Sequence, residues 1–126
     1  MESKDLFDKG LTLRREVAGA DLVDRAFANA DDFSLAMEEL VTEFCWGGIW
    51  ARPGLDRRSR SILNIGMLVA ANKPEQLAGH LKAGITNGLT KDEIKEILLQ
   101  AAIYLGMPAG LSSFKIARQV FDEMGI

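Results

Sequence analysis

Residues 41–60, VTEFCWGGIWARPGLDRRSR, gather many of the side chains in this sequence that could do chemistry. The segment contains both tryptophans, the only cysteine and four of the eight arginines. Arginine guanidinium groups bind carboxylates through paired hydrogen bonds, and the free N–H groups at a helix start also attract anions. Indole rings offer flat apolar surfaces beside them. The segment therefore predicts a binding site for a small anion.

The acidic and aromatic residues of this segment have helical spacing. If a helix runs on to Trp50, then Glu43, Trp46, Gly47 and Trp50 share one face. Two indole walls with a carboxylate between them could hold a flat ring. Packing of the tryptophans at a protein interface is the alternative interpretation.

The arginines of the segment surround a turn and a predicted helix start; they are Arg52, Arg57, Arg58 and Arg60. Cations at a helix N-terminus oppose the helix dipole by about 0.3–1 kcal/mol each. We therefore expect some of them to have an anionic partner, either Asp56 or a ligand. A solvated basic surface is the alternative.

Three side chains beyond this acidic, aromatic and arginine set are also candidates. His80 is the only group whose reference pKa lies near neutrality, and it sits at the edge of an apolar helix face. A core histidine bonded to a backbone carbonyl is the alternative. Arg14 interrupts the apolar side of the first predicted helix. Cys45 has no second cysteine with which to run a dithiol cycle, so we interpret it as a packing residue. One histidine and one cysteine also fall short of a structural zinc site, and we predict no metal.

Helices must position these side chains, because nearly every segment has helical periodicity and none has convincing strand alternation. We predict one all-α domain over residues 1–126, with six to seven helices. The first should span residues 4–18 and the second residues 21–29. A fourth helix, starting near Asp56, is apolar almost all round at ILNIGMLVAA. Such a helix must be buried on most sides, which suggests contact with other subunits.

Several helix boundaries have sequence signals. Asp31 and Asp32 are N-cap candidates for the third helix, and Gly47 with Gly48 should weaken or end it. Pro74 suits the first turn of a fifth helix, and an Asn-Gly pair at 87–88 should stop it. The T-x-x-E sequence at residues 90–93 is a capping box for the sixth, and a seventh should follow Gly106 and Pro108.

Composition indicates a globular protein, with 48% hydrophobic and 26% charged residues and a net charge of −3. This charge gives no reason to expect nucleic-acid binding. The first ten residues lack the features of a secretory signal, and no apolar run approaches the roughly 20 residues of a membrane helix. We therefore expect a cytoplasmic protein that binds neither nucleic acid nor membrane.

The segment 46–61, with the pattern W-G-x-I-W-x-R-P-G-L-x-R-x-x-R-S, resembles the carboxymuconolactone decarboxylase family. Other stretches share the resemblance, which covers nearly the whole chain: residues 14–15, 23–25, 72–80, 87–88, 92–96 and 100–109. It implies an all-α, AhpD-like helical bundle in a homo-oligomeric ring, usually a hexamer built as a trimer of dimers. It also implies decarboxylation of 4-carboxymuconolactone to the enol-lactone of 3-oxoadipate in protocatechuate (β-ketoadipate) catabolism, without metal or organic cofactor.

This reaction suits the candidate residues. The lactone ring accepts the electron pair that carbon dioxide leaves behind, so the substrate supplies its own electron sink. The protein must then grip the substrate, stabilise charge on the lactone oxygen and protonate a ring carbon. We assign catalysis to His80, Arg60 and Glu43, and substrate binding to Arg52, Arg14, Trp46 and Trp50.

The same superfamily includes AhpD-type alkylhydroperoxidases, whose redox centre is a Cys-x-x-Cys shortly before a histidine. The equivalent stretch here, residues 73–76, is KPEQ, and Cys45 lies on a different predicted helix. This departure argues against dithiol peroxidase activity. A redox role, a relative acting on another small lactone or carboxylic acid, and a non-catalytic oligomeric module remain the alternatives.

Overall fold

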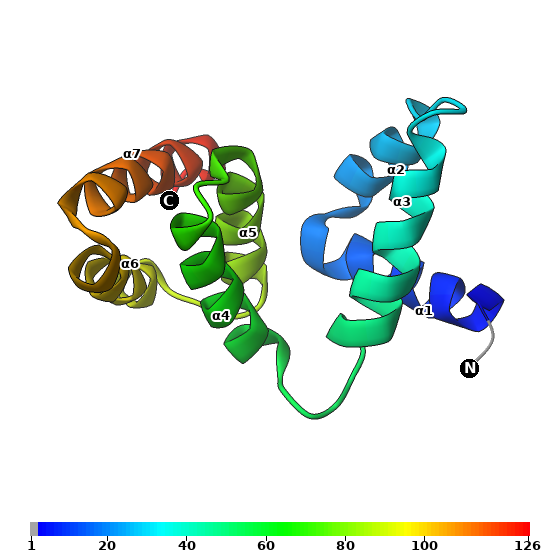
Figure 1. Ribbon diagram of the computed structural model, residues 1–126, viewed down its shortest axis with the longest axis horizontal. Coiled ribbons are helices and arrows are strands. Elements are labelled where there is room, and N and C mark those ends of the chain that lie inside the picture. Colours follow the sequence, from blue (N-terminus) through cyan, green and yellow to red (C-terminus); the bar gives the residue numbers. More distant parts are fainter. Residues whose placement is uncertain (1–2) are drawn as a thin grey trace. The chain divides into compact units, whose positions relative to one another are not determined.

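The computed structural model describes residues 3–126 as seven α-helices and one π-helix, with no strand among them (Figure 1). The all-α prediction is confirmed. The chain divides into two compact units, a first unit that ends at Asp56 and a second unit, Arg57–Ile126. The prediction of one domain over residues 1–126 stays a prediction.

The first unit consists of α1 (Ser3–Ala18), α2 (Ala20–Ala28), α3 (Leu35–Leu40) and the π-helix η1 (Val41–Trp50). The expected first and second helices are confirmed to within two residues. Before α3, the Asp31 carboxylate accepts hydrogen bonds from the backbone N–H groups of Phe33 and Ser34, at 3.0 and 2.9 Å. The N-cap residue of α3 is Ser34, so the prediction of Asp31 or Asp32 at that position is wrong. Asp31 instead organises the turn that leads into the helix.

The predicted end of the third helix at Gly47 and Gly48 is wrong, because the helix continues through both glycines to Trp50. It does so with π geometry, in which a backbone N–H bonds the carbonyl five residues earlier; Ala51 N–H bonds Trp46 O at 3.1 Å. Such helices are rare and often occur at functional sites.

The close packing of α1 on η1 explains why a glycine occurs within this helix, although glycine usually weakens or ends a helix. Helix α1 packs along η1, and a Cβ added to Gly10 would overlap the carbonyl oxygen of Thr42. A Cβ added to Gly47 would overlap the carbonyl oxygen of Leu6. The two backbones therefore lie in direct contact, which only residues without a side chain permit.

The second unit contains α4 (Arg57–Ala70), α5 (Pro74–Thr86), α6 (Lys91–Leu105) and α7 (Met107–Met124). Nine buried aliphatic side chains form its core: Ile65, Val69, Leu77, Leu81, Leu89, Ile94, Leu98, Ala117 and Val120. Helix α4 packs against α5 and α6, and α7 packs against α5 and α6. This core fixes the relative positions of α4 and α5, which carry the candidate residues of the unit.

The sequence signals of the second unit are confirmed with one exception: Pro108 lies in the first turn of α7 rather than before it. Thr90 Oγ1 accepts from Glu93 N–H and Glu93 Oε1 from Thr90 N–H, both at 3.1 Å, which completes the capping box. Pro74 begins α5, and Gly88 has a φ of 100° after that helix ends. Gly106, with a φ of 108°, separates α6 from α7.

Apolar side chains are also exposed on the outside of the second unit. The apolar fourth helix leaves Leu63 and Met67 about half exposed in the single chain, and Tyr104 on α6 is 81% exposed. These residues belong to an apolar groove of about 420 Å³ between α4 and α6. Among the helices of residues 3–126, none combines the length and apolarity that crossing a membrane requires.

Candidate active site

The candidate residues are distributed over both units. Arg14, on α1, and four residues on or just after η1 belong to the first: Glu43, Trp46, Trp50 and Arg52. Arg60, on α4, and His80, on α5, belong to the second.

Trp46 and Trp50 form a stacked pair on η1. Their ring centroids are 4.8 Å apart with an interplanar angle of 28°, and both side chains are buried. A flat ring cannot enter between two rings at this distance, so the idea of a substrate held between them is wrong. That a substrate packs against the pair stays a prediction.

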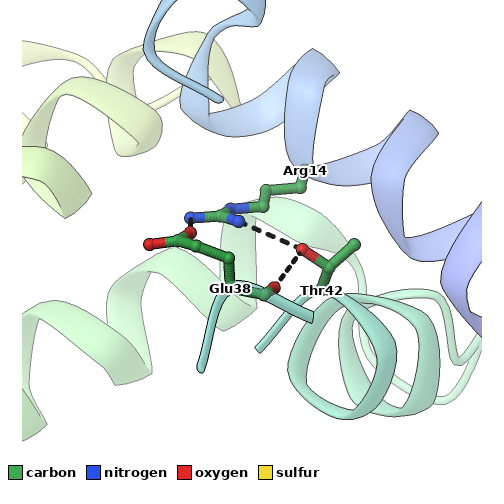
Figure 2. Close-up of polar contacts among 3 residues, drawn as sticks. All are labelled: Arg14, Glu38 and Thr42. Atoms are coloured by element: carbon green, nitrogen blue, oxygen red, sulfur yellow. Dashed lines mark hydrogen bonds and ion pairs between the residues drawn. The ribbon is translucent and has the colours of Figure 1, made fainter. Parts of the chain in front are cut away.

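Arg14 is the centre of a polar cluster that the sequence did not predict. Figure 2 shows its guanidinium reaching from α1 to two acceptors: it donates to Glu38 Oε1 on α3 at 2.9 Å and to Thr42 Oγ1 on η1 at 3.0 Å. Thr42 in turn donates to the Glu38 carbonyl oxygen at 2.7 Å. The guanidinium also lies over the Phe27 ring, 5.8 Å from its centroid. Arg14 is thus held in one orientation by two hydrogen bonds and an aromatic face.

The other predicted polar residues differ in burial: Glu43 and Arg60 are partly buried, whereas Arg52 is exposed. One carboxylate oxygen of Glu43, Oε1, is buried and has no hydrogen-bond partner among residues 3–126. Nε of Arg60 is buried as well. Arg52 follows η1 and is exposed. Glu43 is the more unusual of these, because a buried carboxylate oxygen is seldom left without a donor.

His80 is partly buried on α5 and contacts Asn64 on α4. Burial lowers the pKa of His80 below its usual value of 6.5, because the charged imidazolium loses hydration. The imidazole is therefore neutral at pH 7. It carries one N–H donor and one unprotonated nitrogen, which suits it to donate a hydrogen bond to a developing oxyanion.

Cys45 is partly buried on η1. Burial raises the pKa of its thiol, and the nearby charge of Arg14 opposes that rise. The thiol is protonated at neutral pH and is a poor nucleophile in that form. These features agree with the interpretation of Cys45 as a packing residue.

The expectation that some of the four arginines have an anionic partner is confirmed for Arg58, although its partner is neither of the two candidates considered. Arg58 forms an ion pair with Glu93 on α6, rather than with Asp56 or a ligand. Glu93 uses its other carboxylate oxygen in the capping box. Sequence reasoning missed this pair because the two residues are far apart in the chain and meet only through the packing of α4 on α6.

Nothing in residues 3–126 offers three or more His, Cys, Asp or Glu side chains grouped as metal ligands. The sequence did not predict three polar neighbours of the candidate residues: Glu38 and Thr42 beside Arg14, and Asn64 beside His80. One signal existed for Asn64, because it is a polar residue within the apolar run of α4.

Comparison with known proteins identifies the class of protein. Residues 36–119, two thirds of the chain, match the model of the Carboxymuconolactone decarboxylase family, and the chain belongs to that family. The matched region includes η1, α4, α5 and α6 whole, and with them every candidate residue except Arg14.

Individual relatives are similar over nearly their full length. The chain is 38% identical over 126 residues to the 4-carboxymuconolactone decarboxylase of Acinetobacter baylyi, which covers all of this chain and 94% of that protein. It is also 38% identical over 119 residues to the nitrosuccinic acid decarboxylase npaB of Metarhizium robertsii, covering 94% of this chain and 83% of that protein. Both relatives are named as decarboxylases.

Proposed function

We propose that this chain catalyses the cofactor-independent decarboxylation of 4-carboxymuconolactone to 3-oxoadipate enol-lactone, a step of protocatechuate catabolism in the β-ketoadipate pathway. The observation that carries the proposal is its similarity, along the whole chain, to the Acinetobacter baylyi enzyme. The neutral, partly buried imidazole of His80 and the fixed guanidinium of Arg14 supply groups of the required kind.

The reaction breaks the bond between the ring and its carboxylate. The electron pair of that bond moves through the ring onto the lactone oxygen, carbon dioxide leaves, and a ring carbon then gains one proton. The barrier falls if the enzyme stabilises the negative charge on the lactone oxygen more strongly than it stabilises the substrate. One well-placed hydrogen-bond donor contributes about 3–4 kcal/mol to such a step.

His80 is proposed as that donor. A neutral imidazole gives a hydrogen bond readily but gives up its N–H proton with difficulty, so at pH 7 the oxyanion role suits it better than full proton transfer. Its expected general-acid role then requires that His80 accept a proton from water while the substrate is bound.

Arginines are proposed to grip the carboxylates of the substrate. Arg52 and Arg60 stay the first candidates, with Arg14 behind them because Glu38 already neutralises its charge. Glu43 is proposed to orient His80 or an arginine through its buried, unpartnered oxygen. Trp46 and Trp50, stacked as one apolar surface, are proposed to exclude water from the departing carboxylate.

The assembly is proposed to be a ring-shaped homo-oligomer, a hexamer built as a trimer of dimers, located in the cytoplasm. The exposed apolar side chains on α4, α6 and α7 support this proposal; among them are Leu63, Met67, Ile103, Tyr104 and Leu111. Monomeric proteins rarely expose large contiguous apolar patches.

Nitrosuccinic acid is a second candidate substrate, favoured by the equal identity to npaB. Its nitro group can accept the electron pair of a neighbouring carboxylate, as the lactone does in 4-carboxymuconolactone. Both candidates are therefore carboxylates with an adjacent oxygen-bearing electron sink, and the pocket decides between them.

The test is a side-by-side assay of both compounds with the purified chain. 4-Carboxymuconolactone is generated in situ, its loss is followed by ultraviolet absorbance, and released carbon dioxide is measured in parallel. We expect kcat/KM for 4-carboxymuconolactone to exceed that for nitrosuccinic acid by about 100-fold or more. The reverse order would favour the second candidate, and no turnover of either would favour a non-catalytic module.

The redox alternative is tested with hydrogen peroxide and the substitution Cys45→Ser. We expect negligible peroxide turnover by the wild-type chain and unchanged decarboxylation by the variant, because the Cys45 thiol is protonated and has no second cysteine. Robust peroxide turnover that the substitution abolishes would revive the redox alternative.

A further inference from the structure

The side chain of Asn87 joins the end of α5 to the start of α4, two helices that pack against each other (Figure 1). Its Nδ2 donates to Ser61 Oγ at 2.9 Å, and it makes a longer bond of 3.5 Å to the backbone carbonyl oxygen of Arg57. Asn87 follows the last residue of α5, whereas Arg57 and Ser61 lie about one turn apart at the start of α4. One amide therefore spans the first turn of α4 from outside that helix.

The two acceptors define how the amide of Asn87 is oriented. A carbonyl oxygen accepts and cannot donate, so the Arg57 carbonyl faces the amide nitrogen rather than the amide oxygen. Ser61 is fully buried and continues the buried face of α4 that carries Ile65 and Val69. Because a buried hydroxyl without a partner costs free energy, the bond to Asn87 stabilises this end of the helix.

The turn that Asn87 contacts also carries Arg60. Helix termini fray, since their few hydrogen bonds are open to water. Nε of Arg60 is buried, so unwinding of this turn would move the guanidinium out of its packed position. A hydrogen bond across the turn, donated from another helix end, opposes that unwinding.

An ion pair reaches the same turn from α6. Arg58 pairs with Glu93, but the two side chains are 44% and 38% exposed. Exposed ion pairs contribute little to stability because water screens them and both side chains lose freedom. The bond from Asn87 ends on a buried acceptor and is therefore the stronger of the two restraints.

We propose that Asn87 is a positioning residue that keeps the first turn of α4 wound and thereby fixes Arg60 to bind a substrate carboxylate. Asn87 acts through α4 and need not touch the substrate. The role of Arg60 rests on the proposed function. The winding of the turn is a property of the protein without substrate, so the two parts of the inference are tested separately.

The first test is amide hydrogen exchange of Asn87→Ala, followed by mass spectrometry without substrate. The substitution removes both side-chain bonds and keeps the backbone N–H of residue 87, which bonds the Ala83 carbonyl oxygen at 2.9 Å. Residues 60–62 carry the first N–H groups of α4 that bond within the helix. We expect these groups to exchange about 10-fold faster or more than in the wild type.

The second test shows whether the turn acts through Arg60. We expect Asn87→Ala to raise KM for 4-carboxymuconolactone by about 5-fold or more, with a smaller change in kcat, because the carboxylate grip weakens. In an Arg60→Ala background the same substitution should change KM by less than about 2-fold, since the group that Asn87 positions is gone. A loss of stability alone would leave the KM of the folded enzyme unchanged.

Thr86→Ala is the matched control. Thr86 is the exposed neighbour of Asn87, and its hydroxyl bonds the Lys82 carbonyl oxygen of its own helix at 3.4 Å. We expect the exchange of residues 60–62 and the KM to stay at their wild-type values. Ser61→Ala removes the acceptor and should reproduce both effects of Asn87→Ala. It carries the test if Asn87→Ala fails to fold, which circular dichroism will reveal.

Two results would overturn the inference. One is wild-type exchange of residues 60–62 in a folded Asn87→Ala variant. The other is an equal rise of KM when Asn87→Ala is made in the wild type and in Arg60→Ala. Faster exchange in a chain that decarboxylates neither candidate substrate would instead support the restraint on the turn and contradict the proposed function.

Discussion

The two units of this chain are stabilised by different kinds of contact. In the first unit, α1 and η1 touch backbone to backbone at Gly10 and Gly47, and Arg14 joins the helices through Glu38 and Thr42. In the second unit, nine aliphatic side chains form a continuous core between four helices.

The kind of contact determines which substitutions will displace the candidate residues of each unit. A backbone contact fixes the distance between two helices and tolerates no added atom, whereas an aliphatic core tolerates a change of shape if its volume is kept. The first unit is therefore sensitive to added atoms and the second to removed ones.

Removing atoms from the second core should have the largest effect. Leu81 is fully buried, so Leu81→Ala should lower the free energy of unfolding by about 2–5 kcal/mol through lost burial and a residual cavity. Chemical denaturation followed by circular dichroism measures the loss. Gln76→Ala, exposed on the same helix, is the control and should stay within about 0.5 kcal/mol of the wild type. Equal effects of the two substitutions would mean that the core does not stabilise this unit.

The chemistry of the second unit should depend on one side chain. His80→Gln should lower kcat for 4-carboxymuconolactone by about 100-fold or more while the fold and oligomer survive. Steady-state kinetics and size-exclusion chromatography measure the two properties. Wild-type turnover by this variant would remove His80 from the mechanism.

Adding one methyl group should damage the first unit. In Gly47→Ala the new Cβ would overlap the Leu6 carbonyl, so we expect a loss of about 1–3 kcal/mol in the free energy of unfolding. Gly48→Ala is a close control on the same helix, because the nearest atom to its added Cβ is 3.8 Å away. The control should be neutral or slightly stabilising. A stable Gly47→Ala would show that the two backbones can separate at little cost.

The Arg14 cluster should contribute less than the backbone contact. Thr42 is fully buried and bonds both Arg14 and the Glu38 carbonyl. Thr42→Val keeps the shape but loses both bonds, so we expect a loss of about 1–2 kcal/mol. Thr42→Ser keeps the hydroxyl and should lose less than Thr42→Val. A reversed order of the two variants would mean that the methyl group, not the hydroxyl, is what matters here.

The smallest expected effect is a pH dependence in the second unit. Because the pKa of His80 is lowered on folding, the unfolded chain binds the proton more tightly. The free energy of unfolding should therefore decrease as pH falls below about 6.5, the pKa of the unfolded chain, and level off below the folded pKa. Denaturation of the wild type and of His80→Gln at several pH values between 5 and 8 isolates this contribution. Identical pH profiles would mean that His80 is as hydrated in the folded chain as in the unfolded one.

Helix boundaries were predictable wherever a local chemical group sets them. Thr90 and Glu93 satisfy each other's backbone N–H groups, and Gly106 adopts a φ that other residues avoid. These contacts lie within a few residues of each other, so the sequence displays them directly.

The π-helix was not predictable, because its cause lies elsewhere in the chain. Gly47 looks like a helix breaker when only its neighbours are considered, yet it is required where α1 crosses η1 at Gly10. The partners of the candidate residues were hidden for the same reason. Glu93 reaches Arg58 and Asn64 reaches His80 only after helices pack, so spacing along the chain does not indicate these pairs.

The stacked indoles have a practical consequence. Trp46 and Trp50 are the only two tryptophans and both belong to the first unit, whereas the single tyrosine, Tyr104, and the single histidine belong to the second. Light at 295 nm therefore excites the first unit alone, and exciton coupling between the two rings gives it a circular-dichroism band of its own. Tryptophan fluorescence thus reports on the first unit, and the NMR signals of the single histidine report on the second. A denaturant titration followed by both signals will tell whether the two units unfold together or in sequence.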